Sequence, residues 1–167
     1  MLKQQYAEND RQLWQQVFTT EINYIEKRQQ FLNNCTNRVA LIRQAIHNPA
    51  SRGTALRLVE YLKLEEIQLL FDDLLELASV SHSDIQLCRE AILLLPKKWL
   101  VANIEKSAAP LLIEGTDEEY RRLLELYIEI DWDLTYKLAT KALNHEDIDI
   151  REAGEDFLSY LHSEGKS

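Results

Sequence analysis

The feature that most constrains the fold of this chain is a phrase that recurs along its length. Residues 147–161 read DIDIREAGEDFLSYL and residues 83–95 read SDIQLCREAILLL, with looser copies at 116–127 (TDEEYRRLLELY) and 54–62 (TALRLVEYL). Aligned on one arginine per copy, they are spaced 32, 32 and 30 residues apart. The aligned arginines are Arg57, Arg89, Arg121 and Arg151. Repeats of this length predict a helical solenoid, because each unit buries its apolar face only against its neighbours.

The composition of the chain fits an all-α protein. Its 167 residues suit one domain, and 46% hydrophobic and 28% charged residues are ordinary for a globular chain. With 4 glycines and 3 prolines, it has too few turn residues for an all-β fold. Apolar residues recur at helical spacing and predict about nine helices joined by short turns. We predict a short right-handed superhelical α-solenoid of antiparallel helical hairpins.

The predicted organisation is a single domain over residues 1–167. The repeats occupy residues 51–161, and residues 162–167 form a frayed polar tail. Residues 1–50 do not match the repeats and are predicted to form an N-terminal helical hairpin that caps the first repeat's apolar face. Within this part, residues 8–32 form a glutamine-rich helix with one apolar stripe.

The units at 83–115, 116–146 and 147–161 resemble HEAT repeats, which are helical hairpins that stack into a curved array. In that family an acidic residue at a turn is followed by an arginine on the second helix of a hairpin. The resemblance implies that each arginine reaches the turn acid of its own or an adjacent unit and fixes the stacking. The residues that carry this ladder are Asp84, Arg89, Asp117, Arg121, Asp147 and Arg151.

The net charge of −9 is unevenly distributed, since residues 1–50 have a balance of +2 and residues 51–167 a balance of −11. An acidic body repels phosphates, which argues against nucleic-acid and membrane partners and favours a basic protein partner or simply solubility. Two tryptophans early in the second helices of successive hairpins are interpreted as large core residues between repeats, with binding anchors as the alternative. The candidate partner-binding residues are Trp99, Asp131, Trp132, Asp133, Glu65, Glu66, Asp72 and Asp73.

No residue pattern in the chain predicts a catalytic, metal or cofactor site. The four histidines show no metal-ligand spacing, and four glycines are too few for a phosphate-binding loop. The two cysteines, Cys35 and Cys88, lie among apolar neighbours and indicate a reducing compartment. We therefore expect a cytoplasmic protein that is not an enzyme.

The predicted function is a non-catalytic interaction module or adaptor whose acidic curved face binds a basic partner, as an immunity or inhibitor protein does. The HEAT resemblance leaves open a second function, a subunit of a bilin lyase or another small-ligand-binding enzyme. The DNA glycosylases of that group need a basic groove, which this charge disfavours. A further alternative is a homo-oligomer that self-associates through the N-terminal helix.

Overall fold

The computed structural model describes the backbone of residues 2–164 and the side chains of residues 8–164. Within that range the chain is entirely helical, which confirms the predicted fold class. None of the described helices is long and apolar enough to cross a membrane. The helices are α1 (Leu2–Asn34), α2 (Arg38–Ile46), α3 (Pro49–Val59), α4 (Leu64–Leu69), α5 (Phe71–Ala78), α6 (Ile85–Leu93), α7 (Lys97–Ala108), the 3-10 helix η1 (Pro110–Leu112), α8 (Asp117–Ile130), α9 (Trp132–Leu143) and α10 (Ile148–Glu164).

The chain divides into two compact units, residues 1–41 and residues 42–167. The first consists mainly of α1, a single helix of 33 residues that exceeds the predicted span of 8–32 at both ends. The prediction that residues 1–50 cap the first repeat stays a prediction.

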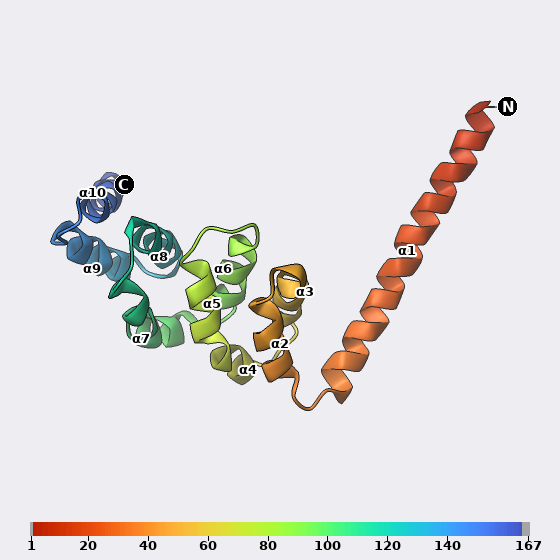
Figure 1. Ribbon diagram of the computed structural model, residues 1–167, viewed down its shortest axis with the longest axis horizontal. Helices are drawn as coiled ribbons and strands as arrows, with labels where there is room; N and C mark the ends of the chain where they lie inside the picture. The colour runs from red at the N-terminus through yellow and green to blue at the C-terminus, as the bar shows by residue number, and fades with distance from the viewer. Residues whose placement is uncertain (1, 165–167) are drawn as a thin grey trace. The chain divides into compact units, whose positions relative to one another are not determined.

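In the second unit the helices pack in two rows (Figure 1). One row holds α3, α6, α8 and α10, and we call it the arginine row because these helices carry the four aligned arginines. In it α3 packs on α6, α8 packs on α10, and an ion pair links α6 to α8. The opposite row holds α5, α7 and α9: α5 packs on α7, and ion pairs link α7 to α9 and to the Asp131 cap that precedes α9. Contacts of α5 with α6, α8 with α9 and α9 with α10 join the rows. Consecutive helices pack together from α4 to α6 and from α7 to α10, as in a solenoid.

The core lies between the rows and is built from the apolar stripes that the sequence indicates. Its side chains are almost entirely leucine, isoleucine and alanine, with two buried tyrosines, Tyr120 and Tyr127, on α8. Burial raises the pKa of Tyr120 above its ordinary value. At roughly 1.5–3 kcal/mol for each fully buried large side chain, these stripes supply the main force that holds the rows together.

Two helix starts follow from capping residues that are visible in the sequence. Thr116 and Glu119 form the predicted capping box at α8, in which Glu119 accepts from the Thr116 backbone N–H at 2.8 Å. Asp131 caps α9 by accepting from the backbone N–H groups of Asp133 and Leu134. Both caps satisfy N–H groups that the first helical turn leaves without an intrahelical acceptor.

An unbroken apolar stripe runs through residues 64–79, but the structure divides this stretch into two helices. α4 ends at Leu69 and α5 begins at Phe71, so residues 2–164 hold ten α-helices and a 3-10 helix where about nine helices were predicted. Leu70, between them, is fully buried, and Asp72 and Asp73 occupy the first turn of α5. Carboxylates stabilise a helix N-terminus, which favours a new start at this point over a continuous helix.

Candidate partner-binding surface

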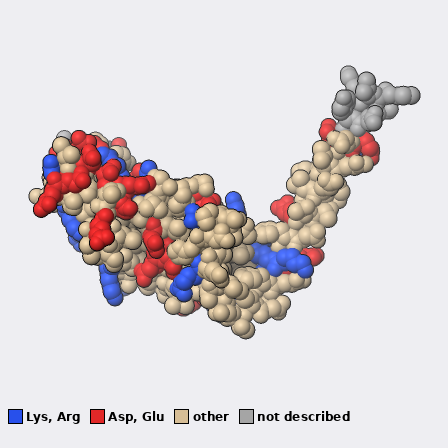
Figure 2. All heavy atoms as spheres, viewed as in Figure 1, with Lys and Arg blue, Asp and Glu red and all other residues tan. Residues whose placement is uncertain are grey.

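The net charge of the chain resides in its last three helices. Residues 117–164 hold fourteen Asp/Glu and five Lys/Arg, a balance of −9, whereas the remaining residues hold fourteen of each and are neutral. Figure 2 shows the acidic side chains gathered over the α8–α10 end of the array. A region of one sign raises the local concentration of oppositely charged groups, so α8–α10 is where a basic partner would be attracted.

A surface hollow lies at the corner between α8 and α9, with a volume of about 330 Å³. We call it the Trp132 hollow, since the Trp132 side chain is 46% exposed there. It brings together three of the residues that the sequence singled out. The lining residues are Lys97, Ile128, Glu129, Ile130, Asp131, Trp132 and Asp133.

A second hollow of about 360 Å³ lies between α8 and α10 and includes Arg89 of α6. We call it the Tyr160 hollow, since Tyr160 is a large exposed aromatic side chain there. Ile128 and Glu129 line both hollows, so the two form one continuous surface. The lining residues are Arg89, Glu125, Ile128, Glu129, Asp156, Phe157 and Tyr160.

The charge of Asp131 is already engaged inside the chain. Its carboxylate lies 3.0 Å from the Lys97 ammonium and accepts from the backbone N–H groups of Asp133 and Leu134 at 3.0 and 3.2 Å. The hydrogen bond from Lys97, together with those N–H donors, lowers the pKa of Asp131. Asp131 therefore serves as the cap of α9. The carboxylates of the Trp132 hollow that remain available to a partner are those of Glu129 and Asp133.

The other predicted tryptophan has a different environment. The Trp99 side chain, on α7, is half-buried, and its ring meets Phe71 of α5 edge-to-face at a centroid distance of 5.0 Å. Trp132, in contrast, projects from the first turn of α9. Both helices belong to the row opposite the arginines. Trp99 thus serves packing, and Trp132 offers an exposed aromatic surface.

The four predicted acids on α4 and α5 lie in the first turns of those helices. Two are held locally: Glu66 accepts from the Lys63 backbone N–H at 3.0 Å, and Asp73 pairs with Arg43 at 2.8 Å and His47 at 2.9 Å. Burial alone would raise the pKa of Asp73, but these hydrogen bonds outweigh it and lower the pKa. Glu65 and Asp72 are exposed, and none of the four lines either hollow.

The three ladder arginines take acceptors other than the turn acids that the resemblance implied. Arg89 contacts Glu125 of α8 at 2.5 Å and the Arg122 carbonyl at 3.2 Å, and Arg121 contacts Asp156 of α10 at 2.8 Å. These acceptors lie on the helix of the next unit because adjacent helices of the arginine row face one another directly. Arg151 donates to the carbonyls of its own preceding turn. Asp84 and Asp147 stand at the starts of α6 and α10, and Asp117 is the first residue of α8.

Glu125 makes the stability of the chain depend on pH. Burial alone would raise its pKa, but hydrogen bonds from Arg89 and Arg122 outweigh burial, so the folded pKa lies below the ordinary 4.5. The unfolded chain then binds more protons, so the contribution of Glu125 is complete above about pH 5 and disappears as pH falls through the folded pKa. We expect the stability advantage of wild type over Glu125→Gln at pH 7 to shrink between about pH 5 and 3. Urea unfolding at several pH values measures this, and a constant advantage would contradict it.

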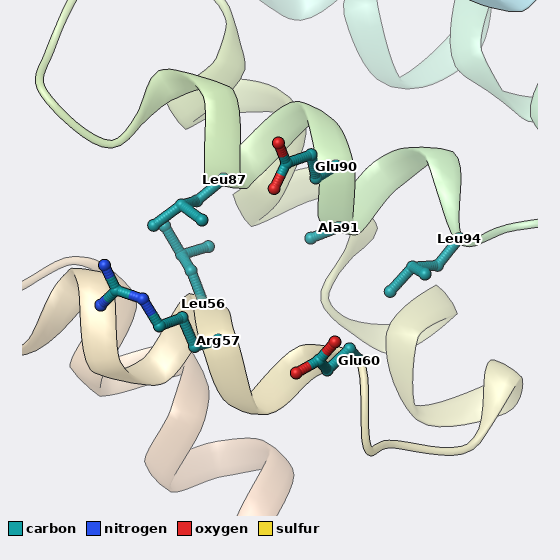
Figure 3. Close-up of a pocket in the computed structure, with 7 residues that line it drawn as sticks. All are labelled: Leu56, Arg57, Glu60, Leu87, Glu90, Ala91 and Leu94. Atoms are coloured by element: carbon teal, nitrogen blue, oxygen red, sulfur yellow. The ribbon is translucent and has the colours of Figure 1, made fainter.

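Another hollow, of about 190 Å³, lies on the arginine row between α3 and α6 (Figure 3). Arg57 and Glu60 border it from α3, and Glu90 borders it from α6. Its remaining lining is leucine and alanine, without an aromatic side chain. Mixed charges and a small volume give it no chemical signature of a particular ligand class.

Eight residues that line the two hollows were not predicted, and four of them are acidic or exposed aromatic side chains: Glu125, Glu129, Asp156 and Tyr160. Charge counted over the whole of residues 51–167 hid the concentration in 117–164, and counting by helix would have located it. Among the described residues, no cluster of three His, Cys, Asp or Glu side chains is placed to hold a metal ion. No family model, curated protein or solved structure matches the chain.

Proposed function

We propose that residues 51–161 are a HEAT-like array and that the chain is a non-catalytic, cytoplasmic interaction module that binds a basic protein segment at α8–α10. Three observations support this: the repeat spacing, the packing of the helices in two rows, and the confinement of the net charge to residues 117–164. Both cysteines are free thiols, which suits a reducing compartment.

The observation that carries the proposal is the continuity of the Trp132 and Tyr160 hollows across Ile128 and Glu129. A lysine or arginine of the partner can stack on the Trp132 ring while Glu129 and Asp133 accept its N–H groups. Cation–π contact contributes about 0.5–2 kcal/mol, and hydrogen bonds to carboxylates add more. The Tyr160 ring provides a second aromatic contact next to Asp156. A bound segment would thus meet aromatic and acidic groups in alternation.

The test is the fluorescence anisotropy of a labelled arginine-rich peptide titrated with the purified chain. We expect binding that weakens as salt rises, and an acidic peptide of equal length should not bind. Trp132→Ala should weaken binding about tenfold, which corresponds to about 1.4 kcal/mol. Glu129→Lys should also weaken it, and the double variant with Asp133→Lys should weaken it further. Asp131 is left intact because it caps α9.

The matched control is Glu76→Lys, which makes the same charge change at an exposed position of α5 outside both hollows. It should change affinity less than twofold. If Glu76→Lys weakens binding as much as Glu129→Lys, or if Trp132→Ala has no effect, the peptide is responding only to overall charge. The proposed surface would then be wrong.

A further inference from the structure

α1 carries a stripe of large apolar side chains that the rest of its own unit, residues 1–41, leaves exposed. Six large apolar side chains of the stripe are exposed, with between 39% and 69% of their surface accessible and Trp14 the highest. At about 100° per residue they fall within one half of the helix circumference. They are Leu13, Trp14, Val17, Phe18, Ile22 and Tyr24. Helices gain most of their stability by burying such a stripe, so α1 presents a face that another surface can cover.

The area of this stripe is large enough for a specific two-helix interface. With the roughly 150–250 Å² of an aromatic side chain taken for every member, the exposed fractions amount to at most about 600 Å² in one copy. Two copies that cover each other would bury up to about 1,200 Å², the lower end of the range of specific protein interfaces. A second copy of α1 therefore offers an apolar stripe of the same area as the stripe that it would cover.

The charge of α1 favours a second copy over the basic partner proposed above. The helix Leu2–Asn34 has four Lys/Arg and four Asp/Glu, so it is neutral, unlike α8–α10. Between positions 12 and 20, the side of α1 opposite the apolar stripe carries only polar uncharged residues. Two neutral helices approach without net repulsion, whereas a basic segment would find no excess of carboxylates here.

The positions of the charges also select an orientation. Glu21 and Arg28 project near the middle of the apolar half, and the Arg28 guanidinium lies 5.7 Å from the Tyr24 ring centroid. A parallel pair in register would set Glu21 against Glu21 and Arg28 against Arg28. An antiparallel pair centred on Phe18 sets Trp14 against Ile22 and brings Arg11 of one copy toward Glu26 of the other, which removes both like-charge contacts.

We propose that α1 pairs with the α1 helix of a second copy of this chain, antiparallel, with Phe18 near the two-fold axis. The interface is isologous, since the same face of α1 is used by both copies. This inference is independent of the proposed partner at α8–α10, because the two surfaces share no residue. The resulting homodimer presents two acidic surfaces.

Sedimentation velocity of the full-length chain from about 1 to 100 μM tests the pairing. We expect a mass approaching twice 19.6 kDa at the higher concentrations. Phe18→Glu should raise the dimer dissociation constant at least about tenfold, and Gln16→Glu, the same charge on the opposite side of α1, should not. Trp14→Ala, which keeps helix propensity, should weaken pairing if Phe18→Glu unfolds α1. A monomer at 100 μM, or equal weakening by Gln16→Glu, overturns the proposal.

Disulfide cross-linking tests the orientation in a background with Cys35→Ser and Cys88→Ala. In the antiparallel pair the two copies of position 14 are about 12 Å apart along the helix, too far for a disulfide, whereas position 14 faces position 22. A mixture of Trp14→Cys and Ile22→Cys chains should therefore form the mixed disulfide. Efficient cross-linking of Trp14→Cys chains to one another overturns the antiparallel arrangement.

Discussion

Replacing Gly154 with alanine should destabilise the chain by about 1–3 kcal/mol, although alanine is the better helix former. Gly154 lies in α10, where a Cβ atom would stand 2.7 Å from the Ala139 carbonyl oxygen and 2.7 Å from the Leu143 backbone nitrogen. Both are backbone atoms of α9, so they cannot rotate away as a side chain can. The two helices would have to separate, and the tight packing of α9 on α10 would be lost.

Gly53→Ala is the matched control, since it makes the same substitution inside another helix. At Gly53 the added Cβ meets only the ends of the Asp84 and Arg57 side chains, at 3.2 and 3.3 Å. Those groups can move, so the gain in helix propensity should leave this variant unchanged or up to about 1 kcal/mol more stable. Urea unfolding followed by circular dichroism measures both variants. Loss of similar size at both sites would show that the close approach at Gly154 has no special role.

Arg89→Met should cost about 2 kcal/mol, the second large effect that the structure leads us to expect. The Arg89 side chain is only 11% exposed and links α6 to α8 through Glu125 and the Arg122 carbonyl. Its removal leaves the Glu125 carboxylate with one arginine partner, Arg122, in a half-buried position. The Arg89 Nε is buried without an acceptor, and its loss offsets part of the cost.

Arg121→Met provides the comparison, because the same substitution is made on the same row. The Asp156 partner of Arg121 is 64% exposed, and pairs of this kind contribute under about 1 kcal/mol. A double-mutant cycle with Glu125→Gln should assign at least about 1 kcal/mol of coupling to Arg89 and Glu125. Equal losses in Arg89→Met and Arg121→Met, with no coupling, would mean that the α6–α8 contact rests on apolar packing alone.

The sequence predicts local features of this fold better than contacts between units. Capping residues such as Thr116 and Asp131 act within one turn, so their roles are visible without a structure. The 3-10 turn at Pro110 follows from the missing backbone N–H of proline in the same way. The break at Leu70 is harder to predict, because an unbroken apolar stripe runs through it. The burial of Leu70 favours the break together with the two carboxylates in the first turn of α5.

The candidate site shows the same limit. The alternation of aromatic and acidic residues at Asp131, Trp132 and Asp133 is a local pattern, and the structure does place these residues in one hollow. Periodicity could not show which neighbouring helix faces each arginine, so the partners Glu125 and Asp156 were missed. Trp99 and Trp132 occupy similar sequence positions, yet only the first meets a ring of another helix. That difference depends on tertiary contacts.

The packing of consecutive helices, such as α9 on α10, also bears on how fast the second unit folds. Contacts between α5 and α6, α8 and α9, and α9 and α10 close short loops, and chains rich in such local contacts fold in microseconds to milliseconds. Each pair can form as soon as its residues leave the ribosome, without waiting for a distant segment. α10 is made after α9, so the close contact of Gly154 with the α9 backbone forms only when the second helix of this pair has been synthesised.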